Sequence, residues 1–164
     1  MKLVDMDIRP AKASDLDALF ALERSIPTAP HWPRRAYDSI LADDIFAPRR
    51  CLIVAEGREL LGFAVGVVHP AGDAELESVA VAESARRQGV GGALCAAVAN
   101  WCCRQGASEL LLEVRAASAG AIALYTKLGF AGVGRRTGYY RQPEDDAVVM
   151  RLRLEVPVGN PEEM

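Results

Sequence analysis

The sequence has little of what several large protein classes require. Only 6% of its 164 residues are aromatic, and 19 basic against 22 acidic residues leave a net charge of −3. A charge this small creates no strong field for nucleic acid, so we expect no nucleic-acid partner. The longest apolar run, Gly89–Ala99, is shorter than the roughly 18–20 residues that cross a bilayer, so we expect no membrane partner.

Histidine and cysteine are also scarce and scattered. Neither His31 nor His69 has another histidine or a cysteine three or four positions away, and Cys102 and Cys103 are adjacent, a spacing typical of neither a zinc site nor a redox Cys-x-x-Cys. We therefore expect no metal, and thiols that stay reduced in the cytoplasm. The first ten residues agree with that localisation, because Asp5 and Asp7 interrupt the apolar run that a signal peptide needs.

What the chain does have is enough apolar sequence for a sizeable core. Hydrophobic residues make up 51% of the chain, and the length fits one domain. We expect a single domain over residues 1–156. Residues 157–164 contain two prolines and two glutamates, and we expect them to form a flexible tail.

The pattern of apolar and turn residues predicts an α+β chain that begins as an antiparallel meander. Helices are expected from Ser14 and over Arg34–Asp43, Ala93–Gln105 and Ala119–Leu128. Strands are expected over Ile8–Pro10, Cys51–Glu56, Leu60–Val68, Ala74–Val81, Leu110–Val114, Phe130–Arg136 and Ala147–Leu154. Tyr139 and Tyr140 are expected in or near the loop between the last two strands.

The strongest local signal is Arg86–Gly92, Arg-Arg-Gln-Gly-Val-Gly-Gly, between a predicted strand and a predicted helix. Three glycines let backbone N–H groups close around an anion, and the following helix adds its positive dipole end. Arg86 and Arg87 add charge. Ala93 and Leu94 exclude a P-loop, and Leu94 also replaces the third glycine of a dinucleotide fingerprint. The segment suits a pyrophosphate.

Three flanking segments narrow this interpretation: Leu76–Val81 before the loop, and Leu112–Arg115 and Ala121–Phe130 after it. Together they resemble the GNAT superfamily of acyl-CoA-dependent N-acyltransferases, and within it the ribosomal-protein-alanine N-acetyltransferases. The resemblance extends from Ile8 to about Leu154. It implies the GNAT fold, a layered, mostly antiparallel mixed sheet of six to seven strands flanked by about four helices. In that fold the sheet opens after the predicted 74–81 strand to admit acyl-CoA.

The resemblance also implies how acetyl-CoA is bound. Main-chain groups of residues 79–81 would hold the pantetheine arm, and N–H groups of residues 87–92 would hold the pyrophosphate. Ser118 stands where the family usually has a cofactor-binding asparagine; its side chain is shorter but still donates and accepts hydrogen bonds. The expected acetyl-CoA contacts are Val79, Ala80, Val81, Arg86, Arg87, Gln88, Gly89, Val90, Gly91, Gly92 and Ser118.

For the chemistry, the resemblance assigns Glu113 as general base and Tyr125 as general acid. Two structural alternatives stay open: Glu113 as an exposed residue or an ion-pair partner of Arg115, and Tyr125 as a core aromatic residue. Glu75 is a rival base, because some superfamily members carry the catalytic glutamate at that point of the preceding strand.

The acceptor is expected to be the N-terminal α-amine of a protein or peptide, including a ribosomal protein. The alternatives are a small-molecule amine and a non-catalytic acyl-CoA-binding module. The expected acceptor contacts are Trp32, Glu75, Arg115, Tyr139 and Tyr140, with a structural role as the alternative for Arg115 and hairpin packing for the tyrosines. Gly138 and Arg141 depart from the family pattern, which leaves the acceptor open. Both a monomer and a homodimer fit the sequence.

Overall fold

The structure, a computed structural model, describes residues 5–27, 29–42 and 48–155. Its residues group into two compact units, one within residues 1–67 and 76–98 and the other within 68–75 and 99–164. The expected tail at 157–164 lies outside the described residues. No helix in the described ranges is long and apolar enough to span a bilayer.

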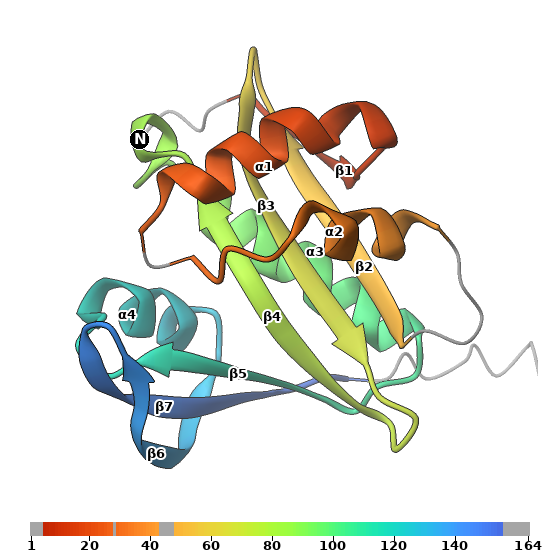
Figure 1. Ribbon diagram of the computed structural model, residues 1–164. Helices are drawn as coiled ribbons and strands as arrows, with labels where there is room; N and C mark the ends of the chain where they lie inside the picture. The colour runs from red at the N-terminus through yellow and green to blue at the C-terminus, as the bar shows by residue number, and fades with distance from the viewer. Residues whose placement is uncertain (1–4, 28, 43–47, 156–164) are drawn as a thin grey trace, which may run out of the picture. The chain divides into compact units, whose positions relative to one another are not determined.

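Seven strands form one sheet in the order β1-β2-β3-β4-β5-β7-β6, which confirms the predicted α+β class (Figure 1). The pairs β1–β2, β5–β7 and β6–β7 are antiparallel, and the pair β4–β5 is parallel. The strands are β1 (Asp7–Pro10), β2 (Arg49–Glu56), β3 (Leu60–Val68), β4 (Asp73–Val81), β5 (Glu109–Arg115), β6 (Ala131–Arg141) and β7 (Glu144–Arg153). The helices are α1 (Leu16–Ser25), α2 (Arg34–Leu41), α3 (Val90–Arg104) and α4 (Ala119–Lys127), with short 3-10 turns η1 (Ala13–Asp15) and η2 (Glu83–Ala85).

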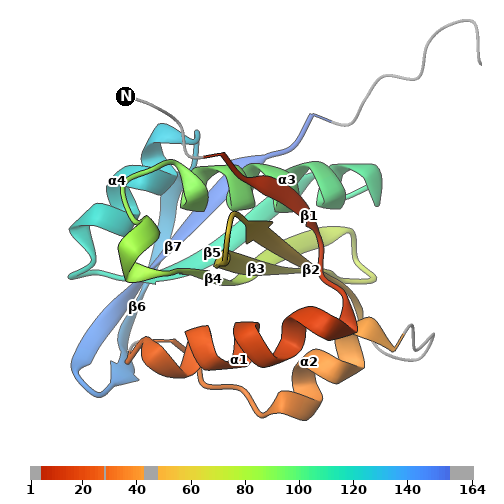
Figure 2. The same cartoon turned by 90° about the horizontal axis from the view of Figure 1, so that it is seen from above.

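In the first unit, α1 and α2 cover one face of strands β2 to β4, and α3 covers the other (Figure 2). The apolar face of α1, with Leu16 and Leu19 three residues apart, is buried, as the helical period requires. It packs in one cluster with Tyr37 of α2 and with residues of the three strands, namely Leu52, Val54, Phe63, Val65 and Ala80.

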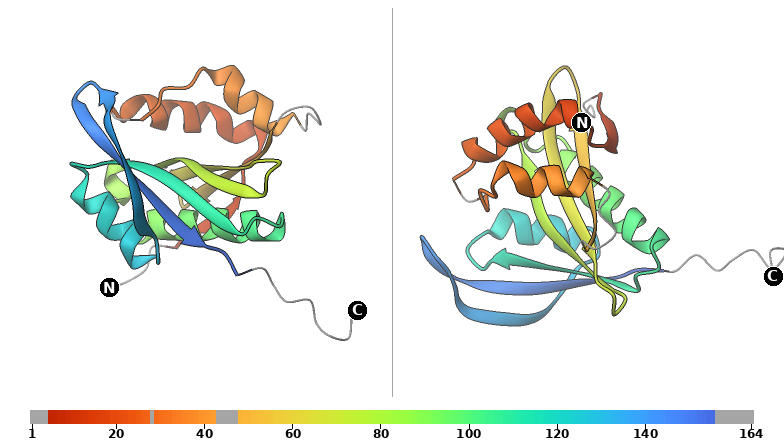
Figure 3. Two further views of the ribbon diagram at one scale, coloured as in Figure 1. Left: turned by 90° about the horizontal axis from the view of Figure 1, so that it is seen from below. Right: turned by 45° about the vertical axis from the view of Figure 1, so that its right-hand side comes forward.

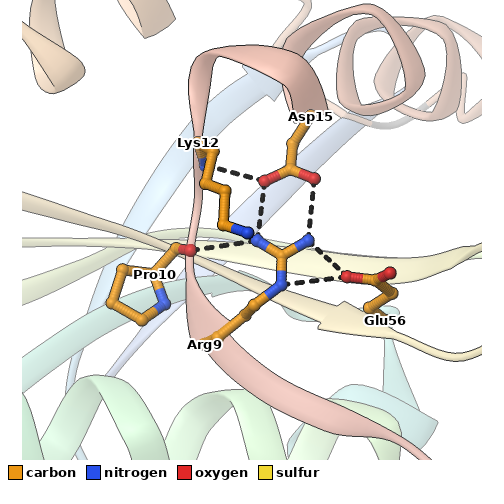
Figure 4. Close-up of polar contacts among 5 residues, drawn as sticks. All are labelled: Arg9, Pro10, Lys12, Asp15 and Glu56. Atoms are coloured by element: carbon orange, nitrogen blue, oxygen red, sulfur yellow. Dashed lines mark hydrogen bonds and ion pairs between the residues drawn. The ribbon is translucent and has the colours of Figure 1, made fainter.

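A polar cluster joins β1, η1 and the end of β2 in this unit (Figure 4). Arg9 donates from Nη1 and Nη2 to the two carboxylate oxygens of Asp15, at 2.8 and 2.9 Å, and from Nε to Glu56 at 2.9 Å. Asp15 also accepts from the backbone N–H of Lys12 at 2.7 Å. The sequence predicted a helix from Ser14; instead η1 comes first and α1 begins at Leu16.

In the second unit, β5, β7 and β6 run side by side, with β7 and β6 forming a long hairpin (Figure 3). Along β5, buried residues alternate with half-buried ones, so Leu110, Leu112 and Val114 face one side and Glu113 the other. The hairpin turn is tighter than the sequence predicted. Tyr139 and Tyr140 belong to β6, and only Gln142 and Pro143 separate the two strands, because β6 and β7 stay paired out to Arg141 and Glu144.

Candidate functional site

The glycine-rich segment of the first unit is a turn followed at once by a helix. The prediction that α3 begins at Ala93 is wrong, because it begins at Val90 and includes Gly91 and Gly92 in its first turn. Ala93 N–H donates to the Gly89 carbonyl at 3.0 Å and is the earliest paired N–H of the helix. The N–H groups of residues 90–92 precede it and have no acceptor within the helix, which is the feature that binds anions at helix N-termini.

Glycine is required for backbone conformation at only one of the three loop positions. Gly89 has φ +83°, in the left-handed region, and Arg87 also adopts a positive φ of +63°. Gly91 and Gly92 are helical, a conformation that any residue can adopt. What they contribute is that no side chain covers the N–H groups of the first turn. Arg86 and Arg87 are exposed and add positive charge to this helix end.

The other loop residues assigned to acetyl-CoA contribute through the backbone. The Val90 side chain is buried in the unit, at 1% exposure. Gln88 turns back and donates from its side-chain amide to the Ser84 carbonyl at 3.3 Å. These positions fit the expected main-chain cradle for a pyrophosphate, since neither side chain is needed for it.

The end of β4 is held by close packing on β3. A Cβ on Gly62 would lie 2.6 Å from the carbonyl oxygen of Ala80 and 3.1 Å from the Leu94 side chain. Ala82, just past β4, donates its N–H to the Leu61 carbonyl at 2.8 Å. The backbone over residues 79–81, the expected pantetheine contact, is therefore fixed from one side by a strand that can approach only because Gly62 has no side chain.

In the second unit, Glu113 is at the centre of a half-buried polar cluster. Its side chain on β5 is 19% exposed, and its Oε1 pairs with Nε of Arg136, on β6, at 3.0 Å. A hydrogen bond with Glu113 is the main cause that raises the pKa of the Tyr139 hydroxyl above its usual range. The ion-pair partner that the structure gives Glu113 is thus Arg136, where the sequence suggested Arg115.

Arg115 instead binds the hairpin turn of its own unit. Its guanidinium donates to the carbonyls of Pro143 at 2.9 Å and Gln142 at 3.4 Å, and it lies 4.2 Å from the centre of the Tyr140 ring. Tyr140 in turn meets Tyr139 edge to face, with 5.0 Å between ring centroids. Burial is the main cause that raises the pKa of Tyr140. These contacts support the structural alternative for Arg115.

Tyr125 and Ser118 both belong to α4. The Tyr125 ring is half-buried and meets the Phe130 ring edge to face at 5.7 Å. This packing orients the ring and is compatible with either expected role. Ser118 is the N-cap residue of α4, and its carbonyl accepts the Ile122 N–H at 3.0 Å.

The remaining predicted residues also have local partners. Glu75 lies 3.5 Å from Nε2 of His69, and both side chains are about 40% exposed. In the first unit, Trp32 packs on Tyr37 at 5.7 Å between ring centroids and lies against the core cluster. A search of the described residues finds no group of three or more histidine, cysteine or acidic side chains arranged to hold a metal ion.

Sequence reasoning missed Arg136, the partner of Glu113. Side chains alternate between the two faces along β5, β7 and β6, and this alternation puts Arg136 on the same face as Glu113. The alternation identifies the pair only once the register between the strands is known. The register contains two shifts in β6, between Gly132 and Gly134 and between Arg136 and Tyr140. Each shift changes which residues share a face, so counting from the sequence alone does not identify the pair.

Comparisons with known proteins agree with the fold. The chain matches the acetyltransferase (GNAT) family over residues 16–130. It is 31% identical over 147 residues to ribosomal protein bS18-alanine N-acetyltransferase of Escherichia coli, covering 85% of this chain and 99% of that protein. The crystal structure of the ribosomal-protein-S18-alanine N-acetyltransferase from E. coli superposes with a TM-score of 0.79 at 29% identity, covering 95% and 98% of the two chains.

A second solved structure, Ard1 from Thermoplasma volcanium, superposes with a TM-score of 0.78 at 25% identity and covers 93% of this chain and 99% of that one. The family match spans more than half of the chain and includes the loop, Glu113 and Tyr125. The chain therefore belongs to the GNAT family and is an acetyl-CoA-dependent N-acetyltransferase.

Proposed function

We propose that the protein acetylates the N-terminal α-amine of a protein, with a ribosomal protein as the acceptor, and that Glu113 is the general base and Tyr125 the general acid. The proposed acceptor is supported by the similarity to the E. coli relative, which extends over 99% of that protein's length. That relative is named for the alanine of ribosomal protein bS18. The observation that carries the base is the carboxylate of Glu113, half-buried among polar side chains of β6. A ribosomal acceptor places the reaction in the cytoplasm.

The reaction joins an amine nitrogen to the thioester carbonyl carbon and breaks the carbon–sulfur bond. The amine proton passes to the Glu113 carboxylate, and Tyr125 gives its phenolic proton to the departing thiolate. An α-amine, with a pKa of about 8, is neutral far more often near pH 7 than a lysine amine with a pKa of about 10.4. This difference supports an N-terminal acceptor, because only the neutral amine is a nucleophile.

Acetyl-CoA supplies the activated acetyl group, and residues of the first unit fit its pyrophosphate. The N–H groups of residues 90–92 begin a helix, no side chain covers them at Gly91 and Gly92, and Arg86 and Arg87 carry positive charge beside them. Ser118 would offer acetyl-CoA a side-chain hydroxyl at the position where the family usually has the side-chain amide of an asparagine.

The test is a peptide-library acetylation assay with acetyl-CoA, run beside a panel of small amines. We expect N-terminal peptides to be acetylated and Glu113→Gln to lower kcat at least 100-fold with the Kd for acetyl-CoA unchanged. Glu109→Gln is the matched control: Glu109 lies on the same face of β5 and pairs with Arg151 at 3.9 Å. We expect it to retain activity.

Three outcomes would contradict parts of the proposal. Good turnover of small amines with no turnover of any peptide would remove the protein acceptor. Binding of acetyl-CoA without turnover on any amine would indicate a non-catalytic module. Wild-type turnover in Glu113→Gln would move the base elsewhere, and Glu75→Gln would be tested next.

A further inference from the structure

The β6–β7 hairpin of the second unit contains a bulge that includes Tyr139 and ends at Tyr140. The strand pairs on either side of the bulge leave three residues of β6, 137–139, opposite a single residue of β7, Asp146. A strand bends and twists where such extra residues are inserted, and their backbone groups have no partner on the neighbouring strand. The direction in which the two tyrosines point therefore depends on how this bulge is held.

The side chain of Asp146 holds the bulge at its centre. Its Oδ1 accepts the backbone N–H of Gly138 at 2.8 Å, and its Oδ2 accepts from Nε of Arg135 at 2.8 Å. Gly138 has φ +62°, in the left-handed region, so the backbone leaves the extended path of the strand at this residue. The Gly138 N–H is the main cause that lowers the pKa of the Asp146 carboxyl, and Arg135 is the second. The bond to the bulge is thus the principal contact of this carboxylate.

The strand that carries Asp146 is itself anchored to the turn between β5 and α4. The N–H of Ala116 donates to the Asp146 carbonyl at 2.9 Å, and the N–H of Ala117 donates to Oδ2 of Asp145 at 3.0 Å. Oδ1 of Asp145 accepts the Asp146 N–H at 2.8 Å. The next residue of the turn, Ser118, is an expected acetyl-CoA contact and the N-cap of α4. Asp146 therefore connects the bulge to backbone that leads directly to the start of α4.

We propose that Asp146 is a positioning residue for the acceptor: its bond to the Gly138 N–H sets the bulge so that Tyr139 and Tyr140 meet the acceptor at a fixed place relative to α4. The inference rests on the proposed function and on the expected contact of these tyrosines with the acceptor. A contact that is ordered before binding gives higher affinity than one that the ligand has to order. Without the bond, the bulge backbone gains freedom, and the acceptor has to order it on binding.

The other contacts of the two tyrosines act on their rings and not on the bulge backbone. The Arg115 guanidinium lies 4.2 Å from the centre of the Tyr140 ring, and the rings of Tyr139 and Tyr140 meet edge to face at 5.0 Å. Tyr139 is 50% exposed, so its side chain is accessible to an acceptor. The ring contacts orient the side chains, whereas the bond between Gly138 and Asp146 restrains the backbone from which they extend.

Arg135 and Glu144 provide matched controls for this inference. Arg135→Gln removes the ion pair of Asp146 and leaves the bond to Gly138 in place; the Arg135 side chain is 59% exposed, and ion pairs this exposed contribute little to folding. Glu144→Ala removes a carboxylate from the same strand at an exposed position two residues before Asp146. Both controls change the charge of the hairpin without removing the acceptor of the Gly138 N–H.

The experiment is steady-state kinetics with one saturating concentration of acetyl-CoA and an N-terminal peptide as the varied substrate. In Asp146→Ala we expect the KM for the peptide to rise roughly two- to tenfold, the effect of losing one hydrogen bond, with the Kd for acetyl-CoA unchanged. Asp146→Asn keeps an oxygen for the Gly138 N–H and should restore most of the wild-type KM. Arg135→Gln and Glu144→Ala should have the wild-type KM. A merely structural role would lower kcat through loss of folded protein and leave the KM unchanged.

Hydrogen exchange of the Gly138 amide, followed by NMR, tests the bond itself and needs no turnover. We expect slow exchange in the wild type and in Asp146→Asn, and faster exchange in Asp146→Ala. If Asp146→Ala does not fold, Asp146→Val takes its place in both measurements, because valine suits a strand and has no oxygen to accept the N–H.

The inference is overturned by an unchanged peptide KM in the folded Asp146→Ala or Asp146→Val variant, by an equal rise in Arg135→Gln, or by equal exchange of the Gly138 amide with and without the carboxylate. Failure of the proposed function looks different: the wild type then acetylates no N-terminal peptide, and the positioning role is lost together with the proposed acceptor. If the wild type acetylates peptides and the KM of Asp146→Ala is unchanged, only the positioning role is lost.

Discussion

The hydroxyl of Tyr37, on α2, donates a hydrogen bond to the carboxylate of Glu23, on α1, inside the apolar core of the first unit. Glu23 is 0% and Tyr37 1% exposed. Among the described residues, the second carboxylate oxygen, Oε1, is buried with no hydrogen-bond partner. A buried carboxyl group with one donor depends strongly on that donor, because water does not replace it.

Tyr37→Phe should therefore destabilise the protein by about 1–3 kcal/mol, the cost of leaving a buried polar group without a partner. The double variant Tyr37→Phe/Glu23→Leu should recover part of that loss, since both partners are then apolar. Urea unfolding of the wild type, both single variants and the double variant measures this cycle. A single variant as stable as the wild type would contradict the prediction.

The Tyr37–Glu23 pair also predicts how the stability of the protein changes at alkaline pH. Burial is the main cause that raises the pKa of Tyr37, and the hydrogen bond to Glu23 adds to it. The folded-state pKa is above the unfolded value, so this contribution to stability is complete below about pH 10 and is lost as the pH rises through the higher folded value. Unfolding midpoints measured between pH 9 and the alkaline end of the transition should fall less steeply in Tyr37→Phe than in the wild type.

At the acid end, stability should depend on Asp15. The hydrogen bond from Arg9 is the main cause that lowers the pKa of Asp15 from 3.8 to about 2. The folded pKa is below the unfolded one, so the contribution is complete above about pH 4 and is lost as the pH falls toward 2. Its size is up to about 2 kcal/mol for a shift of this magnitude in a mostly buried side chain.

Asp15→Asn should remove this acid dependence and lower stability at pH 7. Asp17→Asn is the control, because Asp17 also pairs with an arginine, Arg34, but its side chain is 85% exposed. We expect it to leave stability within about 0.5 kcal/mol. Thermal unfolding of Asp15→Asn and Asp17→Asn at pH 2.5, 4 and 7 distinguishes the two variants. The same dependence of stability on pH in both would refute the role given to Asp15.

Much of the fold could be predicted because the sequence marks its elements locally. The apolar runs of β2 and β3 and the alternation in β4 give strands, and glycines at 106 and 129, both with positive φ, follow the ends of α3 and α4. The sequence does not predict the first turn of α3, because Gly91 and Gly92 have poor helix propensity. There, the tertiary structure overrides the local preference.

The resemblance assigns roles to single residues of the candidate site, but it does not give the contacts between them. Glu113 and Tyr125 are recognisable by motif, whereas the pairing of Glu113 with Arg136 depends on the register of two neighbouring strand pairs. The sequence predicts Tyr139 and Tyr140 in or near a loop, whereas the structure continues β6 through Gly138 and includes both tyrosines in the strand. Long-range pairing decides both features, and no short segment encodes it.

Gly62 should tolerate no side chain. In Gly62→Ala the new Cβ would lie 2.6 Å from the Ala80 carbonyl, a backbone atom, so β3 and β4 would have to separate. We expect a loss of about 2 kcal/mol or more in stability and weaker acetyl-CoA binding, because the 79–81 backbone would shift. Gly120→Ala is the control: it lies in α4 with nothing within 4 Å, and alanine should stabilise the helix slightly. Isothermal titration calorimetry measures the binding of acetyl-CoA, and urea unfolding measures stability. Normal acetyl-CoA binding in Gly62→Ala would contradict the prediction for Gly62.

The cysteines should differ widely in reactivity toward iodoacetamide. Burial raises the pKa of Cys95 to about 12, so at pH 8 only about one thiol in ten thousand is the reactive thiolate, and its side chain is out of solvent. Cys51 and Cys102 are also buried, whereas Cys103 is partly exposed. Mass spectrometry of the native protein should therefore find Cys103 modified first, and Cys103→Ser should remove that early product. In urea all four thiols should react at similar rates. Labelling of native Cys95 as fast as Cys103 would show that the core around α3 opens far more often than its burial implies.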